Sequence, residues 1–145
     1  METTRIITEG IVATSFMTAF SYIVSNIREK QFREPEILNE LLSRSDLFRL
    51  KLKKTSSAGW ILHYLIGWMF VILFEVVWQL KLIPFSILYG ALLGLIAGII
   101  GIAGWQIMFW MNKNSPKITW NEYYLQLLIA HIIFGTIAAL IYVVW

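Results

Sequence analysis

The sequence contains no cysteine. This absence excludes disulfide bridges, thiolate metal sites and iron–sulfur clusters held by the usual four cysteines. The short motifs of common enzymes are also missing: the chain has no HExxH pair, no P-loop, no glycine-rich dinucleotide turn and no Ser-His-Asp pattern. The sequence therefore indicates a protein that is not an enzyme, with an enzyme acting on lipid kept as an alternative.

Charged residues are scarce as well. Only 14% of the residues are charged and 58% are hydrophobic, and a water-soluble domain of this size could not cover so much apolar side chain. The 48 residues from Tyr64 to Met111 hold only Glu75 and Lys81. Apolar runs of about 18 or more residues can cross a hydrocarbon core as helices. Four such runs occupy about residues 8–25, 58–80, 85–111 and 120–145.

These four runs predict an all-α membrane protein with four transmembrane helices. A lipid-facing barrel would alternate polar and apolar residues, which the runs do not do. Helices satisfy their backbone groups within one segment, as lipid requires. The first run is expected to be a retained span and not a cleaved signal peptide, because Glu2 and Glu9 flank Arg5 and the basic cluster follows the apolar stretch.

The basic residues concentrate between the first two runs. Residues 26–57 hold eight of the twelve Lys and Arg residues, so the positive-inside rule predicts that this segment is cytoplasmic. Both chain ends and Lys81 then lie outside, and Lys113 and Lys117 lie inside. We expect a multi-pass membrane protein.

The same segment carries an amphipathic pattern over about residues 35–50. Pro35 suits a first helical turn, and apolar residues recur at helical spacing at Ile37, Leu38, Leu41, Leu42 and Phe48. We expect a helix at the cytoplasmic membrane face. It is either a connector packed on the bundle or, through residues 28–54, a docking surface for anionic lipid or a cytosolic partner; residues 26–57 carry eight basic and five acidic residues, a net charge of +3. Nucleic acid is not an expected partner, because the basic excess is confined to this segment.

The remaining connections are short. "KLIPFS" and "NKNSPKIT" leave room only for antiparallel hairpins. The sequence therefore predicts an up-and-down four-helix bundle with one amphipathic helix after the first span.

Two segments, "HYLIGWMFVILFEVVW" and "HIIFGTIAALIYVVW", resemble each other. Each starts with a histidine, His63 or His131, has a glycine four residues later, Gly67 or Gly135, and ends in Val-Val-Trp. The match is either accidental or the trace of two helical hairpins related by an axis along the membrane normal. One turn from each histidine, the glycine leaves room for a neighbouring helix or a flat cofactor.

Small residues form a stripe along the third run. Small side chains let helix backbones approach closely in lipid. The pattern predicts a tight helix contact, within the chain or between copies, and we expect a homo-oligomer or a membrane-complex partner through this face. The residues are Gly90, Gly94, Ala97, Gly98, Gly101 and Gly104.

Polar side chains also occur inside the predicted spans. Glu75, with Gln79 one turn later, must protonate, find a partner or face water, unless it lies close enough to the headgroups to be interfacial. Glu122 is expected to be an interfacial anchor. Hydroxyl groups on the first run can bond their own helix, bond another helix or line a wet passage; they belong to Thr14, Thr18, Ser21 and Ser25.

Three functions fit these groups. His63 and His131 have the chemistry of an axial pair for haem b, in a membrane electron carrier. Together with Glu75, the two histidines are also candidates for a path for protons, ions or small solutes in an oligomer. The third function, which we predict, is a structural, accessory or assembly subunit whose histidines form hydrogen bonds within the bundle.

The histidine–glycine pair of the second run, the glycine-rich third run and "HIIFG" in the fourth resemble the small YagU-type bacterial inner-membrane proteins. The resemblance covers the last three runs. It implies a four-helix inner-membrane fold and no assigned chemistry.

Overall fold

The computed structural model describes residues 3–45, 50–112 and 116–145, which form five helices and no strand. The helices are α1 Thr3–Arg28, α2 Glu34–Arg44, α3 Ser57–Gln79, α4 Ile87–Trp110 and α5 Trp120–Val144. The prediction of four long apolar helices is confirmed: α1, α3, α4 and α5 are each long and apolar enough to cross a membrane. The amphipathic helix is shorter than residues 35–50, because Ser45 is already extended; Phe48 lies outside the described residues.

Local sequence signals set several helix ends. The hydroxyl of Ser56 accepts a hydrogen bond from the Ala58 N–H, and that of Ser86 accepts one from the Tyr89 N–H, as N-cap residues do. After α1, Glu29 takes a left-handed φ of 52°. This conformation at the first position beyond a helix is a common helix stop. Lys81, which follows the C-cap residue of α3, has a φ of 53° and stops that helix in the same way.

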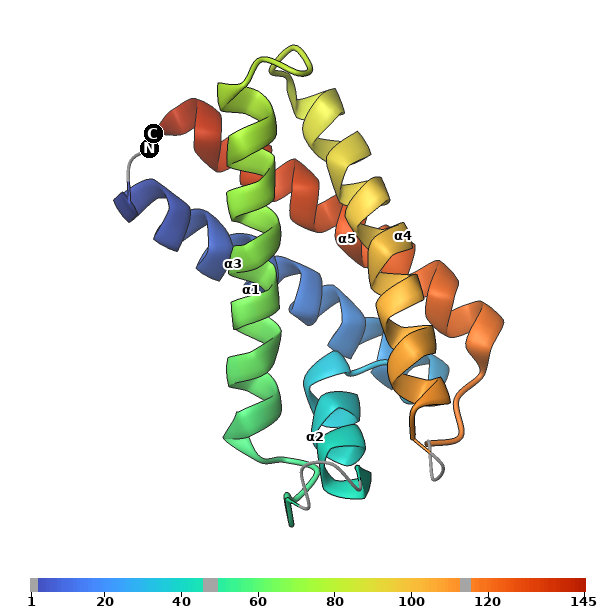
Figure 1. Cartoon of the computed structure of the whole chain (residues 1–145). Helices are drawn as coiled ribbons and strands as arrows, with labels where there is room; N and C mark the ends of the chain where they lie inside the picture. Colours follow the sequence, from blue (N-terminus) through green and yellow to red (C-terminus); the bar gives the residue numbers. More distant parts are fainter. Residues whose placement is uncertain (1–2, 46–49, 113–115) are drawn as a thin grey trace.

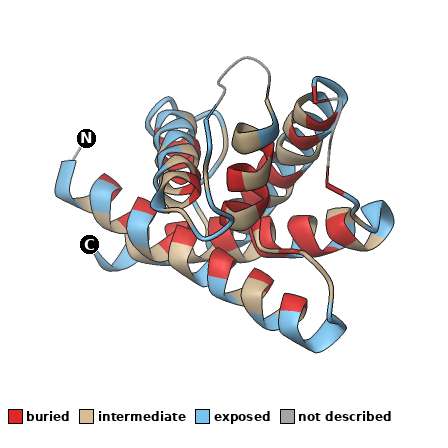
Figure 2. Ribbon diagram, turned by 90° about the horizontal axis from the view of Figure 1, so that it is seen from below, coloured by how far each residue is buried: buried red, intermediate tan, exposed pale blue. Residues whose placement is uncertain are grey.

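The helices form two layers. In Figure 1, α3 and α4 stand side by side in front, with α2 between their lower parts, and α1 and α5 run antiparallel behind them. Figure 2, seen from below, shows the same two layers. The start of α1 and the end of α5 lie near each other, on the side of the molecule away from α2 (Figure 1).

α3 and α4 diverge from their connecting turn, which differs from the closely paired hairpin that the short turn predicts. The α4–α5 contact is the most extensive in the fold and the α3–α4 contact is the smallest of the main helix pairs. α4 follows α5 because its glycines allow close approach there, whereas α3 packs on α1. The result is an opening between α3 and α4 rather than a regular bundle.

The amphipathic helix α2 is buried in the lower half of this opening. Ile37 and Leu38 are at most 2% exposed, and they belong to an apolar cluster with Trp105 of α4 and Leu127 of α5. The apolar side of α2 is therefore covered by the chain itself, and its position at the cytoplasmic membrane face stays a prediction. Of the two alternatives for this segment, the structure has the connector that packs its apolar side on the bundle.

Asn39 fixes α2 to the start of α3. Its amide nitrogen donates to the Lys54 and Ser56 carbonyl oxygens at 2.9 and 2.7 Å, and its amide oxygen accepts from the Gly59 N–H at 2.8 Å. A Cβ atom on Gly59 would lie 2.1 Å from the Pro35 carbonyl oxygen. Glycine is therefore needed where α3 passes α2.

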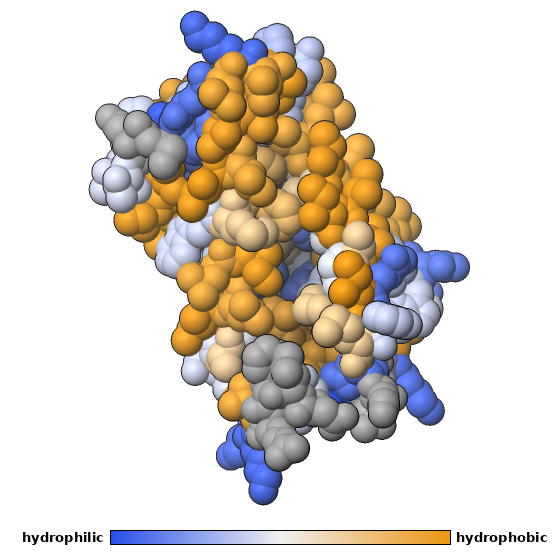
Figure 3. Space-filling model, in the orientation of Figure 1, coloured by the Kyte–Doolittle hydropathy of each residue, from blue (hydrophilic) through white to orange (hydrophobic). Residues whose placement is uncertain are grey.

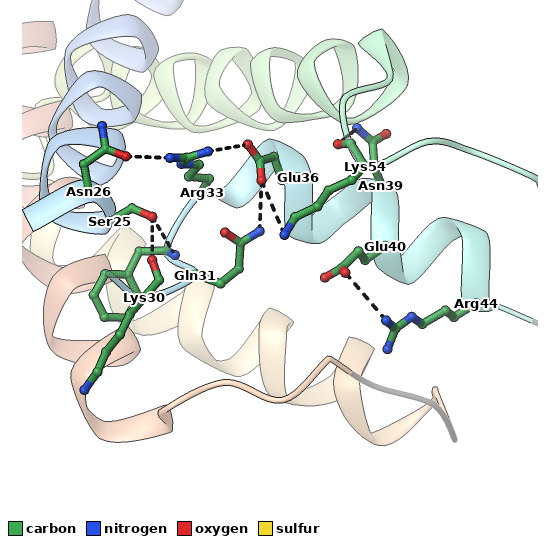
Figure 4. A network of polar contacts seen from close by, with 11 residues as sticks. Ser25, Asn26, Lys30, Gln31, Arg33, Glu36, Asn39, Glu40, Arg44 and Lys54 are labelled. Atoms are coloured by element: carbon green, nitrogen blue, oxygen red, sulfur yellow. Dashed lines mark hydrogen bonds and ion pairs between the residues drawn. The ribbon is translucent and has the colours of Figure 1, made fainter. Parts of the chain in front are cut away.

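Much of the positive charge of residues 28–54 is paired inside the chain (Figure 4). Glu36 contacts Arg33 at 3.0 Å and Lys54 at 3.7 Å. Glu122, expected to be an interfacial anchor, contacts Arg28 and Lys30 and so links α5 to the end of α1. This pairing leaves less charge for anionic lipid than the composition implies.

The outward faces of the long helices are apolar. Phe16, Ile61, Leu88, Ile99 and Leu125 are each more than half exposed, and hydrophobic atoms dominate the face seen in Figure 3. Contiguous exposed apolar surface of this extent is typical of contact with lipid. The fold thus has the features of a multi-pass membrane protein.

Candidate functional site

A cavity of about 220 Å³ lies between α3 and α4. In the view of Figure 1, α1 and α5 lie behind it and α2 lies at its lower end. Figure 3 shows it as a hollow in the apolar surface, with more hydrophilic atoms at its floor. Three ionisable residues line it: Glu34, His63 and His131. The rest of the lining is mainly apolar and includes Met17, Ile66, Phe70, Trp105, Met108 and Phe134.

His131 reaches the cavity from α5. Its Nδ1 lies 2.9 Å from the Leu127 carbonyl oxygen, which can only accept, so Nδ1 carries the hydrogen and donates it. In the neutral ring, Nε2 is then an acceptor. This side of the ring faces Gly101, where a Cβ atom would lie 3.4 Å from Nε2, and no described residue hydrogen-bonds to Nε2.

His63 reaches the same cavity from α3. Its Nε2 lies 2.9 Å from the Thr18 hydroxyl oxygen, and Thr18 donates its only hydrogen to the Thr14 carbonyl oxygen at 2.6 Å. The ring must therefore donate from Nε2. Its Nδ1 is left as an acceptor in the neutral form, and the described residues supply it with no donor.

Glu34 brings a carboxyl group to the cavity from the first turn of α2. The side chain is 1% exposed, and its Oε1 accepts from the Ser21 hydroxyl at 2.8 Å and from the Gln126 amide at 3.4 Å. Its Oε2 is buried without a hydrogen-bond partner among the described residues. Burial raises the pKa of Glu34 to about 7, although hydrogen bonds from its own backbone, Ser21 and Gln126 act in the opposite direction.

The glycines beside the two histidines are used for helix packing. A Cβ atom on Gly67 would lie 2.0 Å from the Thr14 hydroxyl oxygen of α1, and one on Gly135 would lie 2.2 Å from the Gly90 carbonyl oxygen of α4. The space beside each glycine was expected to admit a neighbouring helix or a flat cofactor, and in the structure a neighbouring helix occupies it. The two predicted hairpins are α1 with α3 and α4 with α5, and in each the glycine faces the first helix of its own hairpin. Equivalent hairpins would pack α1 on α5 as extensively as α4 on α3. Instead, α1 packs on α5 far more extensively than α3 on α4. The two hairpins are therefore not equivalent in their packing.

Most of the small-residue stripe on α4 faces α5. A Cβ atom on Gly94 would lie 2.2 Å from the His131 carbonyl oxygen, and one on Gly98 would lie 3.1 Å from Leu128 and from the His131 Cβ. Ala97 is 1% exposed. This part of the stripe therefore makes its close contact within the chain, and the expected homo-oligomer stays a prediction. Gly104, which lines the cavity, has nothing within 4 Å of its Cβ position.

Glu75 has found a partner at the other end of the core. The Arg5 guanidinium donates to both of its carboxylate oxygens from Nη2, at 2.9 and 2.7 Å, and contacts Glu9 at 3.3 Å. Gln79 donates to Glu75 at 3.2 Å, and the Tyr142 ring lies 4.1 Å from the guanidinium carbon. We call Arg5, Glu9 and Glu75 the Arg5 cluster. It does not line the cavity, so Glu75 and the histidines do not share one site.

The hydroxyl groups of α1 point inward and serve packing as well as the cavity wall. Ser21 bonds to Glu34 and Thr18 to His63, while the Ser25 hydroxyl bonds to the Lys30 carbonyl oxygen at 2.5 Å. The buried Thr14 hydroxyl oxygen has no hydrogen-bond partner among the described residues.

Sequence reasoning missed Glu34, Arg5 and Glu9. A signal existed for each. Glu34 shares a helical face with Leu38 and Leu41, at spacings of four and seven residues, so the apolar side of the amphipathic helix includes an acid. Arg5 and Glu9 are four residues apart in an apolar run, the spacing of an ion pair on one helix face.

The cavity does not fit a haem held by both histidines. The Nε2 of His63 is engaged by Thr18, helices occupy both glycine gaps, and a volume of 220 Å³ is below the roughly 300 Å³ where drug-sized ligand pockets begin. Among the described residues, no group of three His, Cys, Asp or Glu side chains is arranged to hold a metal ion.

No family model, curated protein or solved structure matches this chain. The resemblance to YagU-type proteins stays a prediction.

Proposed function

We propose that this chain is a non-enzymatic, accessory multi-pass protein of a bacterial inner membrane that holds a small lipid-soluble molecule between α3 and α4. The observation that carries the proposal is the cavity, which is apolar except for Glu34, His63 and His131. Ligand pockets commonly combine an apolar lining with a few convergent polar groups.

The position of the cavity supports a ligand that enters from the membrane. The hollow lies in an apolar face between two helices that diverge (Figures 1 and 3), and Met69, which also lines the cavity, is 49% exposed. A molecule dissolved in the hydrocarbon layer would reach the cavity sideways without crossing water. Residues 26–57 would face the cytoplasm and both chain ends the outside, as the basic excess favours.

Extraction and mass spectrometry of the protein purified in mild detergent test this function. We expect a small molecule to co-purify with the wild-type chain and to be lost in Gly104→Leu, because the new side chain would enter open space in the cavity. Ala103→Leu is the matched control, since Ala103 is exposed on the same helix. Equal amounts of bound molecule in both variants would contradict the proposal.

Conduction of protons or ions remains the alternative. It requires a path that includes Glu75, whose two carboxylate oxygens both accept hydrogen bonds from Arg5 Nη2. Ion or proton flux in liposomes, abolished by His131→Ala and Glu75→Gln, would favour conduction over ligand binding.

A further inference from the structure

The three ionisable groups of the cavity are all hydrogen-bond acceptors or groups that become acceptors. The hydrogens of the two rings are already donated to Leu127 and Thr18, which leaves lone pairs on His131 Nε2 and His63 Nδ1. The third group, Glu34, accepts from Ser21 and Gln126 and keeps Oε2 without a partner.

The cavity also has no positive side chain. No Lys or Arg is among the described residues that line it, whereas the buried Glu75 is paired with Arg5. A buried carboxylate without a cation is unfavourable in an apolar surrounding. A ligand that supplies both a positive charge and N–H donors would complete the site.

We infer that the cavity binds an amphiphilic amine, with its ammonium group at Glu34 and His131 and its hydrocarbon part along the apolar walls. This inference rests on the proposed function, because it names the class of molecule that the cavity holds. An ammonium group has N–H donors and no acceptor, which matches the free lone pairs of Glu34, His63 and His131. A hydrocarbon chain too long for the cavity extends between α3 and α4 toward the lipid.

Proton binding at Glu34 competes with the amine. The titratable groups that line the cavity with Glu34 are His63 on α3 and His131 on α5, and Tyr123 of α5 lies within electrostatic reach. α1 contributes Tyr22, which also lies within electrostatic reach of Glu34, and the uncharged Ser21. α4 contributes Trp105 and glycines, none of which titrates. Ionisation of Glu34 above about pH 7 therefore favours the bound ammonium, and release of the amine accompanies protonation.

Calorimetric titration of the full chain in detergent tests the inference with three probes of equal chain length. Decylamine has a cationic head with N–H donors, decyltrimethylammonium has the charge without donors, and decanol has a neutral hydroxyl. We expect decylamine to bind most tightly, and its affinity to fall about tenfold or more in Glu34→Gln, since hydrogen bonds to charged groups are the stronger ones. Its binding to the wild type should strengthen as the pH rises through about 7.

Gly104→Leu and Ala103→Leu separate the inference from the function on which it rests, and neither variant alters Glu34. Decylamine binding lost in Gly104→Leu and kept in Ala103→Leu supports a site in the cavity. Decanol binding as tightly as decylamine, with no effect of Glu34→Gln, overturns the inference and leaves the cavity as a binding site. Absence of decylamine binding to the wild type also overturns the inference. If Gly104→Leu then retains the co-purified molecule, the proposed function falls too.

Discussion

Two buried acids lie at opposite ends of this core and differ in their partners. Glu75 is fully buried and receives two hydrogen bonds from Arg5, so α1 and α3 are tied together across the sequence. Glu34 is almost as buried, but its partners are the neutral Ser21 and Gln126, and it lines a cavity. The comparison teaches that burial alone does not make an acid functional. Glu75 has a cation within the chain, whereas Glu34 has only neutral partners among the described residues.

The largest expected effect is at the Arg5 cluster. Arg5→Met leaves Glu75 and Glu9 buried without a positive charge, and removal of one partner from a buried ion pair costs about 3–5 kcal/mol. We expect denaturant unfolding in detergent to show a loss of this order in the free energy of unfolding.

A triple variant checks that the loss comes from uncompensated charge. Glu9→Gln and Glu75→Gln added to Arg5→Met should recover much of the stability, because neutral or apolar replacements of a whole buried ion pair are often tolerated. If Arg5→Met alone is as stable as the wild type, the Arg5 cluster does not hold the helices together.

The next largest effect is the pH dependence that Glu34 confers. The pKa of Glu34 is about 7 in the folded chain against an ordinary value of 4.5, so the folded chain binds more protons between these two pH values. The stability contribution of Glu34 therefore falls as the pH rises from about 4.5 to about 7, by about 3 kcal/mol in total at roughly 1.4 kcal/mol per pH unit. Unfolding measured across this range in the wild type and in Glu34→Gln should differ by this slope. Parallel profiles would contradict the burial of an unpaired carboxyl group.

A smaller effect is expected on the packed part of α4. A side chain at Gly94 would meet the His131 backbone, where a Cβ atom comes within 2.2 Å of the carbonyl oxygen. Overpacking of this kind typically costs about 1–3 kcal/mol, so Gly94→Leu should unfold at a lower denaturant concentration than the wild type. Unchanged stability would mean that α4 and α5 do not pack closely at this point.

The smallest effect on stability is expected where α4 lines the cavity. Gly104 has open space at its Cβ position, and leucine is favoured over glycine in a helix by up to about 1 kcal/mol. Gly104→Leu should therefore be as stable as the wild type or slightly more stable. A strong destabilisation by Gly104→Leu would show that the cavity is filled by other parts of the chain.

The four long helices could be predicted from the sequence because apolar length is a local property. The cost of a charge in hydrocarbon predicted that Glu75 would protonate, find a partner or face water, without deciding among these outcomes. The partner itself could not be predicted, since Arg5 is 70 residues away in the chain and only the tertiary fold brings it close. A local pattern also cannot distinguish a helix on the membrane face from one buried between α3 and α4, because both have one apolar side.

The cavity was beyond sequence reasoning for a similar reason. A short turn determines that α3 and α4 are antiparallel, but not the angle at which they diverge. That angle depends on Gly90, Gly94 and Gly135, which allow α4 to pack closely on α5, while α3 packs on α1. The structure places both His63 and His131 in the lining of one cavity, although the hairpins that carry them pack differently.

Photo-crosslinking with an alkylamine that carries a diazirine in its chain tests the central claim most directly. Peptide mapping should place the crosslinks at residues of the cavity such as Phe70 and Met108, and excess decylamine should suppress them. Crosslinks confined to outward-facing residues such as Ile61 and Leu65, unaffected by excess decylamine, would contradict a ligand site between α3 and α4.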